Sequence, residues 1–516
     1  MTKFSCLFVV LLLFSCKDKD AKEPIKTEPE ALNFSYKEKF RPQFHFSPPQ
    51  KWMNDPNGLV YHDGTYHLFY QYYPEDIVWG PMHWGHAVSP DMIKWENKPI
   101  ALFPDEHGLI FSGSAVVDTN NTSGFGKDGT VPLVAIFTYH LMEGEKAGRK
   151  DFQTQGIAFS LDNGDTWEKY SGNPVIGNEG IKDFRDPKVF WHETSQKWIM
   201  ALVAGDHVKF YNSDNLKDWN LISEFGKDVG AHGGVWECPD LFKLKVDGGE
   251  EEKWVLLVSI NPGAPNGGSG TQYFVGDFDG TSFSTSQEET KWIDYGMDNY
   301  AGVTYNNVPT GERVFIGWMS NWNYARNTPT EVWRSAMTLP RDITLHKDEG
   351  SYFIKSMPLP QFSDLQETTE VMDSIVLSET FRLEKPSFND SDISFRVNLS
   401  EPLEVHFMND ANESISFSMK PEEGMLYFDR TNSGIVAFEE SFGKEIQKQP
   451  YIPMDREVDI RFIMDASSVE IFMDEGSFIF TNQIFPEKEY TILEIKGDSK
   501  AVLRQFTYHS INSIWN

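Results

Sequence analysis

Three times in this sequence, an acidic residue followed closely by a proline stands ahead of the same arrangement of strands. Asp55, Asp186 and Glu237 each introduce a short strand, a polar turn and a longer apolar strand. Repeats built of short strands are typical of propellers, arrays and solenoids. Because equivalent positions at the start of each inner strand of a propeller face one channel, the repeat predicts that these three acids lie close together.

A second repeat has the order Ser, Asp, turn, Trp after an apolar run. Its copies are residues 89–95, 160–167 and 213–219, with a weaker fourth copy at 276–280. Ordinary hairpin turns are the alternative, but the same order after each strand pair favours a repeated unit. We therefore interpret Asp91, Asp162 and Asp214 as structural residues of outer turns.

Counting groups of strands gives five, and these predict the fold of the first part of the chain. The groups begin near Asp55, Phe111, Asp186, Glu237 and Tyr300, with no long amphipathic helix between them. A five-bladed β-propeller over residues 38–357 is favoured over a β-sandwich or an α/β barrel, since a barrel needs helices.

The composition changes after residues 358–360, where alternating strands replace the tryptophan-rich repeat. This pattern predicts a β-sandwich over residues 365–516. A chain of 516 residues is also too long for one ordinary core. The expected fold class is all-β, a five-bladed β-propeller followed by a C-terminal β-sandwich.

The N-terminus has a basic start and a short apolar segment, which indicate a signal peptide over residues 1–15. Leu13-Phe14-Ser15-Cys16 resembles a bacterial lipobox, so Cys16 is the expected lipidation site. Phe14 is unusual in that motif, which leaves ordinary cleavage as an alternative. Residues 16–37 are charged and read as a disordered tether. We expect an exported protein that is lipid-anchored to the bacterial cell envelope, or otherwise periplasmic or secreted, with membrane contact only through the anchor.

Charge and cysteine usage limit the possible partners. The formal net charge of −31 would repel a phosphate backbone, which argues against nucleic acid as a partner. Only three cysteines are present, and the histidines do not form a metal-binding pattern. This pattern argues against a zinc site. The high aromatic content, 14%, suits stacking against sugars.

Three converging carboxyl groups suit glycoside hydrolysis, in which one carboxylate attacks and another carboxyl protonates the leaving oxygen. Glu237 lies between apolar neighbours, and burial raises the pKa of a carboxyl group, so it suits a general acid. Asp55 has asparagines one position before and two positions after it, and their amides would favour an ionised nucleophile. Asp186 follows Arg185, whose charge should keep it ionised as a stabiliser of developing positive charge.

Several segments resemble the signature motifs of glycoside hydrolase family 32, the β-fructofuranosidase family of invertases, inulinases and levanases. They are residues 52–58, 111–114, 184–187 and 236–240, with further likeness at 69–72, 79–86, 317–322 and 469–486. The resemblance runs from about residue 41 to the C-terminus, and its motifs occur in the family's order.

The resemblance implies a retaining double displacement on β-D-fructofuranosyl units, with no cofactor and no metal. Asp55 matches the family nucleophile, Glu237 the acid/base and Asp186 the transition-state stabiliser. The residues that match family substrate contacts are Trp52, Asn54, Gln71, Trp79, Phe111, Ser112, Arg185 and Trp318. Packing between blades is the alternative interpretation of the tryptophans, and Cys238 reads as a small buried residue beside Glu237.

The expected function is release of fructose from the non-reducing ends of levan or inulin, with sucrose as a further substrate. A sucrose invertase is the alternative within enzymes, and a non-catalytic surface glycan-binding lipoprotein is the alternative from another class. The sequence leaves both β-2,1 and β-2,6 linkages open.

Overall fold

The structure, a computed structural model, describes residues 34–378, 380–498 and 501–515. The expected signal peptide, Cys16 and most of the expected tether fall on residues 1–33, outside the described part. Tyr36, at the end of the expected tether, is buried, and its ring stacks on Trp515 at 3.9 Å. In the described ranges, no helix is long and apolar enough to cross a membrane.

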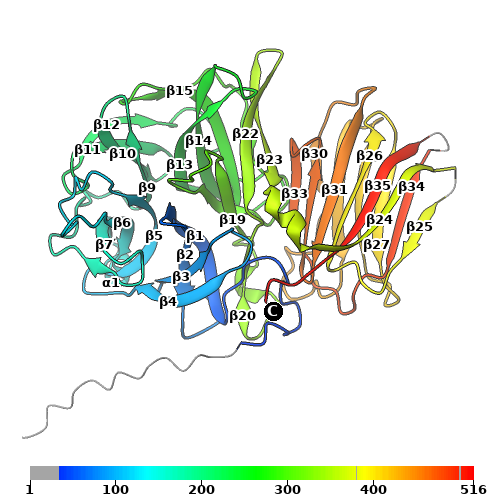
Figure 1. Cartoon of the computed structure of the whole chain (residues 1–516), viewed down its shortest axis with the longest axis horizontal. Coiled ribbons are helices and arrows are strands. Elements are labelled where there is room, and N and C mark those ends of the chain that lie inside the picture. The colour runs from blue at the N-terminus through cyan, green and yellow to red at the C-terminus, as the bar shows by residue number, and fades with distance from the viewer. Residues whose placement is uncertain (1–33, 379, 499–500, 516) are drawn as a thin grey trace, which may run out of the picture. The chain divides into compact units, whose positions relative to one another are not determined.

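The first part of the fold consists of five antiparallel sheets, which follow one another along the chain (Figure 1). The first two sheets contain β1 (Lys51–His62), β2 (Thr65–Tyr73), β3 (His83–Ser89) and β4 (Glu96–Leu102), and then β5 (Leu109–Val117), β6 (Leu133–His140), β7 (Gln153–Ser160) and β8 (Glu168–Lys169). The third contains β9 (Phe184–His192), β10 (Lys197–Ala204), β11 (Val208–Ser213) and β12 (Asn220–Phe225).

The fourth and fifth sheets have extra short strands. The fourth contains β13 (Val235–Lys245), β14 (Glu252–Asn261), β15 (Gly270–Phe278), β16 (Phe283–Ser284) and β17 (Lys291–Trp292). The fifth contains β18 (Tyr300–Thr304), β19 (Val314–Met319), β21 (Ala336–Met337), β22 (Arg341–Asp348) and β23 (Ser351–Pro358). The helical elements are α1 (Met142–Lys146), η1 (Ala325–Asn327) and η2 (Pro360–Leu365).

The first strands of the five sheets form a closed ring, in which β1 contacts β5, β5 contacts β9, β9 contacts β13, β13 contacts β18 and β18 contacts β1. Two backbone links join the last sheet to the first. The short strand β20 (Trp333–Arg334) pairs in parallel with the start of β1, and Asn306 exchanges backbone hydrogen bonds with Leu59 and Tyr61. Middle strands such as β6 are buried along their whole length, because neighbouring sheets cover both faces.

The second part contains two six-stranded sheets, which follow η2 in the chain. One has the order β24 (Gln366–Val376), β35 (Val502–Ile511), β26 (Ser391–Asn398), β31 (Glu457–Asp465), β32 (Ser468–Met473) and β33 (Phe478–Gln483). The other has the order β25 (Phe381–Glu384), β34 (Ile492–Gly497), β27 (Leu403–Met408), β28 (Ser414–Lys420), β29 (Met425–Asn432) and β30 (Gln447–Pro450). Alternating apolar side chains from both sheets share one core, in which Phe462 contacts Phe407 and Phe417.

A one-residue bulge occurs at the same place in all five first strands. In each strand two residues lie opposite one on the neighbouring strand, between the paired positions 53 and 56, 110 and 113, 185 and 188, 237 and 240, and 300 and 303. A bulge bends a strand and changes the direction of its side chains, and it also accommodates a proline inside a sheet. The acid-proline pairs therefore mark bulges within strands. Asp55 lies inside β1, whereas the sequence predicted it at the first residue of a strand after a turn.

The Ser-Asp repeat forms outer turns, as predicted for Asp91 and Asp162. Asp91 Oδ1 accepts hydrogen bonds from Ser89 Oγ and two backbone amides, and Asp162 Oδ1 accepts from Ser160 Oγ. The third copy differs from the prediction by one residue. Asn215, and not Asp214, accepts the hydrogen bond from Ser213 Oγ, because the side chain two positions after the serine occupies this place in every copy.

A buried network of charged side chains joins the five-sheet part to the two later sheets. Arg341 on β22 donates to Glu470 on β32 at 2.7 Å and to Asp294 at 3.1 Å. His45 lies between Asp465 and Glu470, with ring nitrogens 2.8 and 3.1 Å from their oxygens. Each acid in this network therefore faces a cationic or proton-donating partner.

Candidate active site

The three acids predicted from the repeat line one pocket of about 250 Å³. Asp55, Asp186 and Glu237 come from β1, β9 and β13, at or beside the bulges of these strands. The closed ring of first strands explains how residues so distant in sequence converge. The convergence expected from the acid-proline repeat is thus present in the structure.

Both carboxylate oxygens of Asp55 accept hydrogen bonds. Asn54 Nδ2 donates to Oδ1 at 2.9 Å, and Ser112 Oγ, from the bulge of β5, donates to Oδ2 at 2.7 Å. Asn57, the other donor expected from the sequence, does not contact Asp55: its amide donates to the Pro56 carbonyl and its oxygen accepts from Gln71. These two donors fix the orientation of the Asp55 carboxyl group, which lines the pocket.

Glu237 contacts a cation on one oxygen and a phenol on the other. Arg185 donates to Oε1 from Nη2 at 2.9 Å and from Nε at 3.2 Å, and Tyr300 Oη donates to Oε2. Burial and the charge of Asp55 raise the pKa of Glu237, although the nearby Arg185 guanidinium opposes the shift. The sequence-based expectation of a raised pKa for this residue agrees with this environment.

Asp186 behaves differently from the expectation based on its neighbour Arg185. Burial raises its pKa to about 7; the Arg185 charge opposes this, while the charges of Glu237 and Asp55 add to it. Arg185 lies 3.9 Å from Asp186 Oδ2, but it pairs with Glu237 at 2.9 Å and with Asp183 at 2.8 Å. The backbone amide of Cys238 donates to Asp186 Oδ2 at 3.0 Å.

Cys238 lies between two of the acids, with Sγ 3.6 Å from Asp55 Oδ2 and 3.7 Å from Asp186 Oδ2. Burial and these negative neighbours raise the pKa of the thiol well above its usual value. Cys238 is therefore a neutral, weak donor that separates two carboxyl groups. Within the described ranges, no group of three or more His, Cys, Asp or Glu side chains is placed to hold a metal ion.

Most of the predicted substrate contacts line the same pocket. Those that do are Asn54, Gln71, Trp79, Phe111, Ser112 and Arg185. Trp52 and Trp318 are instead fully buried and outside the lining, where they pack against each other and against Trp322. Trp52 Nε1 donates to Asn54 Oδ1 at 2.7 Å, so it contacts the pocket through Asn54.

Sequence reasoning did not identify several residues of the pocket. The missed residues are His140, Glu145, Phe152, Gln153, Asp183, Asn261, Trp322 and Arg326 in the lining, and Tyr300 beside Glu237. Trp322 lies in the segment 317–322 that resembled the family, four residues after the tryptophan that was chosen. Of the others, four lie at the ends of strands, namely His140 in β6, Gln153 in β7, Asn261 in β14 and Tyr300 in β18. The remaining four, Glu145, Phe152, Asp183 and Arg326, lie in connections, where the sequence gives no periodic signal.

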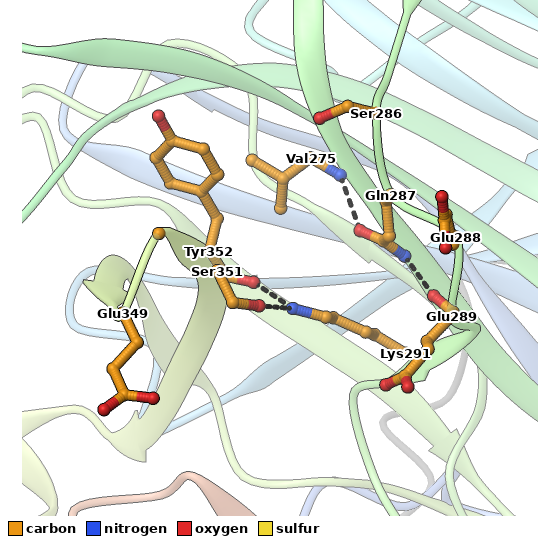
Figure 2. Close-up of a pocket in the computed structure, with 10 residues that line it drawn as sticks. Val275, Ser286, Gln287, Glu288, Glu289, Lys291, Glu349, Ser351 and Tyr352 are labelled. Atoms are coloured by element: carbon orange, nitrogen blue, oxygen red, sulfur yellow. Dashed lines mark hydrogen bonds between the residues drawn. The ribbon is translucent and has the colours of Figure 1, made fainter.

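A larger groove of about 400 Å³ lies elsewhere, at the strands β15 and β17 and the β22–β23 hairpin (Figure 2). Lys291 donates to Ser351 Oγ at 2.8 Å and to the Tyr352 carbonyl. Gln287 accepts from the Val275 amide at 3.2 Å and donates to the Glu289 carbonyl at 2.9 Å (Figure 2). In the groove these polar groups bond to one another, whereas Asp55, Asp186 and Glu237 all line the smaller pocket.

Comparisons with known proteins agree with this geometry. Residues 45–356 match the glycosyl hydrolases family 32 N-terminal domain, and residues 362–510 match the family 32 C-terminal domain. The chain is 45% identical to a levanase of Bacillus subtilis over 492 residues, which cover 93% of this chain and 72% of the levanase.

Two fungal proteins show similar likeness. An extracellular exo-inulinase of Aspergillus niger is 41% identical over 526 residues, which cover 94% of this chain and 96% of the inulinase. The crystal structure of an exo-inulinase from Aspergillus awamori superposes with a TM-score of 0.86 at 38% identity, covering 93% of this chain and all of that one. The pocket with its three acids and these similarities over nearly the whole chain lead to one conclusion: the protein belongs to glycosyl hydrolase family 32.

Proposed function

We propose that this protein is an exported β-fructofuranosidase that releases fructose from the non-reducing ends of levan or inulin, and that also hydrolyses sucrose. The observation that carries the proposal is the convergence of Asp55, Glu237 and Asp186 in one pocket. The names of the related levanase and exo-inulinase support fructans as the substrate class.

In the proposed mechanism, Asp55 attacks the anomeric carbon of the terminal fructosyl unit while Glu237 gives its proton to the leaving oxygen. A covalent fructosyl-enzyme results, and Glu237 then removes a proton from the water that hydrolyses it. The raised pKa of Glu237 supports its role as the acid. Asp186, when ionised, would stabilise the positive charge that develops on the ring.

We further propose that the five sheets are the blades of a five-bladed β-propeller over residues 38–357, and that the two six-stranded sheets form a β-sandwich from 365 to the C-terminus. The closed ring of first strands supports the blade number. The core shared by both later sheets supports the sandwich.

The location is also a proposal. The apolar N-terminal segment and the extracellular exo-inulinase relative support export, and the sequence around Cys16 supports a lipid anchor. Metabolic labelling with a radioactive fatty acid tests the anchor: Cys16→Ser should lose the label and release the protein from the membrane fraction. A label that stays in this variant would contradict the anchor.

Product chromatography after incubation with levan, inulin and sucrose tests the activity. Free fructose as the first product is expected, and a ladder of oligosaccharides would contradict release from chain ends. Glu237→Ala should lose nearly all hydrolysis of these substrates. On p-nitrophenyl β-D-fructofuranoside, whose leaving group departs without protonation, added azide should restore turnover to give β-fructosyl azide. Unchanged turnover in this variant would overturn the acid/base role of Glu237.

A further inference from the structure

The connection between β6 and β7 forms one wall of the pocket. It carries the five-residue helix α1, and it contributes His140, Glu145 and Phe152 to the lining. The proposed mechanism uses none of these residues. The side chain of Glu145 is 45% exposed, whereas that of His140 is only 5% exposed.

A directed chain of hydrogen bonds leads to Glu145. The backbone amide of Phe184 donates to Gln153 Oε1 at 2.7 Å, which fixes the amide orientation of Gln153. Gln153 Nε2 therefore donates to His140 Nδ1 at 3.2 Å, so the ring proton of neutral His140 is on Nε2. That nitrogen lies 3.1 Å from Glu145 Oε2, and it donates to the carboxylate.

The imidazole of His140 has little freedom to rotate. The ring of Phe111 stacks on it at 4.2 Å with an interplanar angle of 9°, and the edge of Phe152 contacts it at 5.2 Å. Burial lowers the pKa of His140 in spite of the adjacent Glu145 carboxylate, which agrees with a neutral ring. An exposed carboxylate on a very short helix is thus held by a buried, oriented partner.

The elements that carry the pocket residues indicate which part of a bound substrate lies next to Glu145. The acids and their donors come from the first strands of the sheets, and the terminal fructosyl ring must lie against them for attack to occur. Connections supply the remaining wall, with Trp79, Glu145, Trp322 and Arg326. The rest of a bound fructan therefore has to leave the pocket past these connections.

We propose that Glu145, positioned by His140, binds hydroxyl groups of the sugar on the leaving-group side of the scissile bond. This inference rests on the proposed function. Glu145 Oε2 is engaged by His140, and no residue of the described ranges donates to Oε1, which can accept from a sugar hydroxyl. Hydrogen bonds to a charged acceptor are stronger than those between neutral groups, so the contact should contribute about 10-fold or more in affinity.

Binding to a hydrolysis-deficient protein tests this directly. In the full-length Glu237→Gln background, titration calorimetry would compare fructose with the trisaccharide 1-kestose, whose additional sugars extend to the leaving side. Glu145→Ala should weaken the binding of 1-kestose about 10-fold and leave that of fructose unchanged. The matched control is Glu143→Ala, an exposed acid of the same helix outside the pocket lining, which should change neither affinity.

Kinetics with the otherwise unchanged enzyme give a second measurement. Glu145→Ala should raise the KM for 1-kestose with little change in kcat, and spare p-nitrophenyl β-D-fructofuranoside, whose leaving group has no sugar hydroxyls. His140→Phe keeps the stacking on Phe111 but removes the Nε2–H donor, and it should shift KM in the same direction by less. Equal losses on both substrates, or none on either, would overturn the inference.

The outcomes separate this inference from the proposed function. If the Glu237→Gln parent binds no 1-kestose and the unmodified enzyme hydrolyses neither substrate, the proposed function is wrong. If both activities are present and Glu145→Ala changes nothing, only the role of Glu145 is wrong.

Discussion

Two of the regions that contain buried carboxyl groups affect the pKa of these groups in opposite ways. At the junction of β22 and β32, burial alone would raise the pKa of Glu470, but Arg341 and His45 lower it to about 2. In the pocket, burial raises the pKa of Asp186 to about 7, and the neighbouring Arg185 only partly opposes it. The number of cationic partners per acid accounts for the difference.

The two pKa values correspond to two different roles of a buried acid. An acid that is fully paired keeps one protonation state over a wide pH range, and it serves as a structural link. An acid that shares one cation with other acids titrates within the working pH range, as proton transfer requires. Replacing residues in each region therefore has different expected consequences.

The largest effect is expected for Asp55→Asn in the pocket. We expect kcat on sucrose to fall by on the order of 10⁴-fold or more, because the attacking carboxylate is lost. The melting temperature should stay the same or rise, since one of several mutually repelling charges is removed. Steady-state kinetics and calorimetry on the same preparation measure both. A clearly lower melting temperature would contradict the comparison.

Removal of a cation at the junction should instead lower the stability of the protein. Arg341→Met leaves Glu470 and Asp294 buried without their partner, and it should lower the free energy of unfolding by about 3–5 kcal/mol. Urea unfolding measures this change. The double variant Arg341→Met with Glu470→Gln should recover part of the loss, and a loss below about 1 kcal/mol for the single variant would show that the network is not structural.

The dependence of stability on pH should follow the protonation of His45. Burial lowers its pKa, but Asp465 and Glu470 raise it to about 9, above the ordinary 6.5. A raised folded-state pKa means that the stabilisation is complete below pH 6.5 and is lost as the pH rises toward 9, by on the order of 2–3 kcal/mol. Unfolding at pH 6, 7.5 and 9 should show this slope, and His45→Gln should remove it. The same slope in that variant would exclude His45 as its source.

The smallest expected effect is a displacement of the pH–activity profile in Arg185→Gln. The Arg185 charge lowers the pKa of Glu237 and of Asp186, so its removal should raise both. Because Glu237 must be protonated and Asp186 ionised, both limbs of the kcat/KM profile should move to higher pH. Arg326→Gln is the control, since Arg326 lines the pocket but its side chain forms no hydrogen bond or ion pair with any of the three acids. A profile that moves to lower pH would contradict this assignment.

The sequence predicted the convergence of Asp55, Asp186 and Glu237 because their motifs repeat with the strands. It did not predict the bulges, since Asp-Pro-Asn-Gly has the local composition of a turn and only the neighbouring strand shows that it is extended. The pairing of Arg185 with Glu237 was missed for a related reason. Adjacent residues in a strand point in different directions, so the nearest charge in sequence is not the nearest in space.

Sequence motifs could not predict which residues of the connections line the pocket. Glu145 lies on the connection between β6 and β7, and nothing in its local sequence distinguishes it from other acids. Tyr300 is different, because it begins β18, where the sequence placed the fifth strand group, but its contact with Glu237 depends on the closed ring. Trp318 and Trp322 lie in one segment, and only their burial shows which of them faces the pocket. Composition and periodicity therefore located the centre of the site but not its outer wall.

The way the ring closes has a consequence for the synthesis of this protein. One edge of the strand that carries Asp55 bonds to Asn306 and to residues 332–334, which are made long after it. A chain that emerges N-terminus first leaves that edge without its partners until almost two thirds of its length is available. A chain exported before residues 306–334 join that edge would carry an open ring, and it would become active only when the ring closes at its destination.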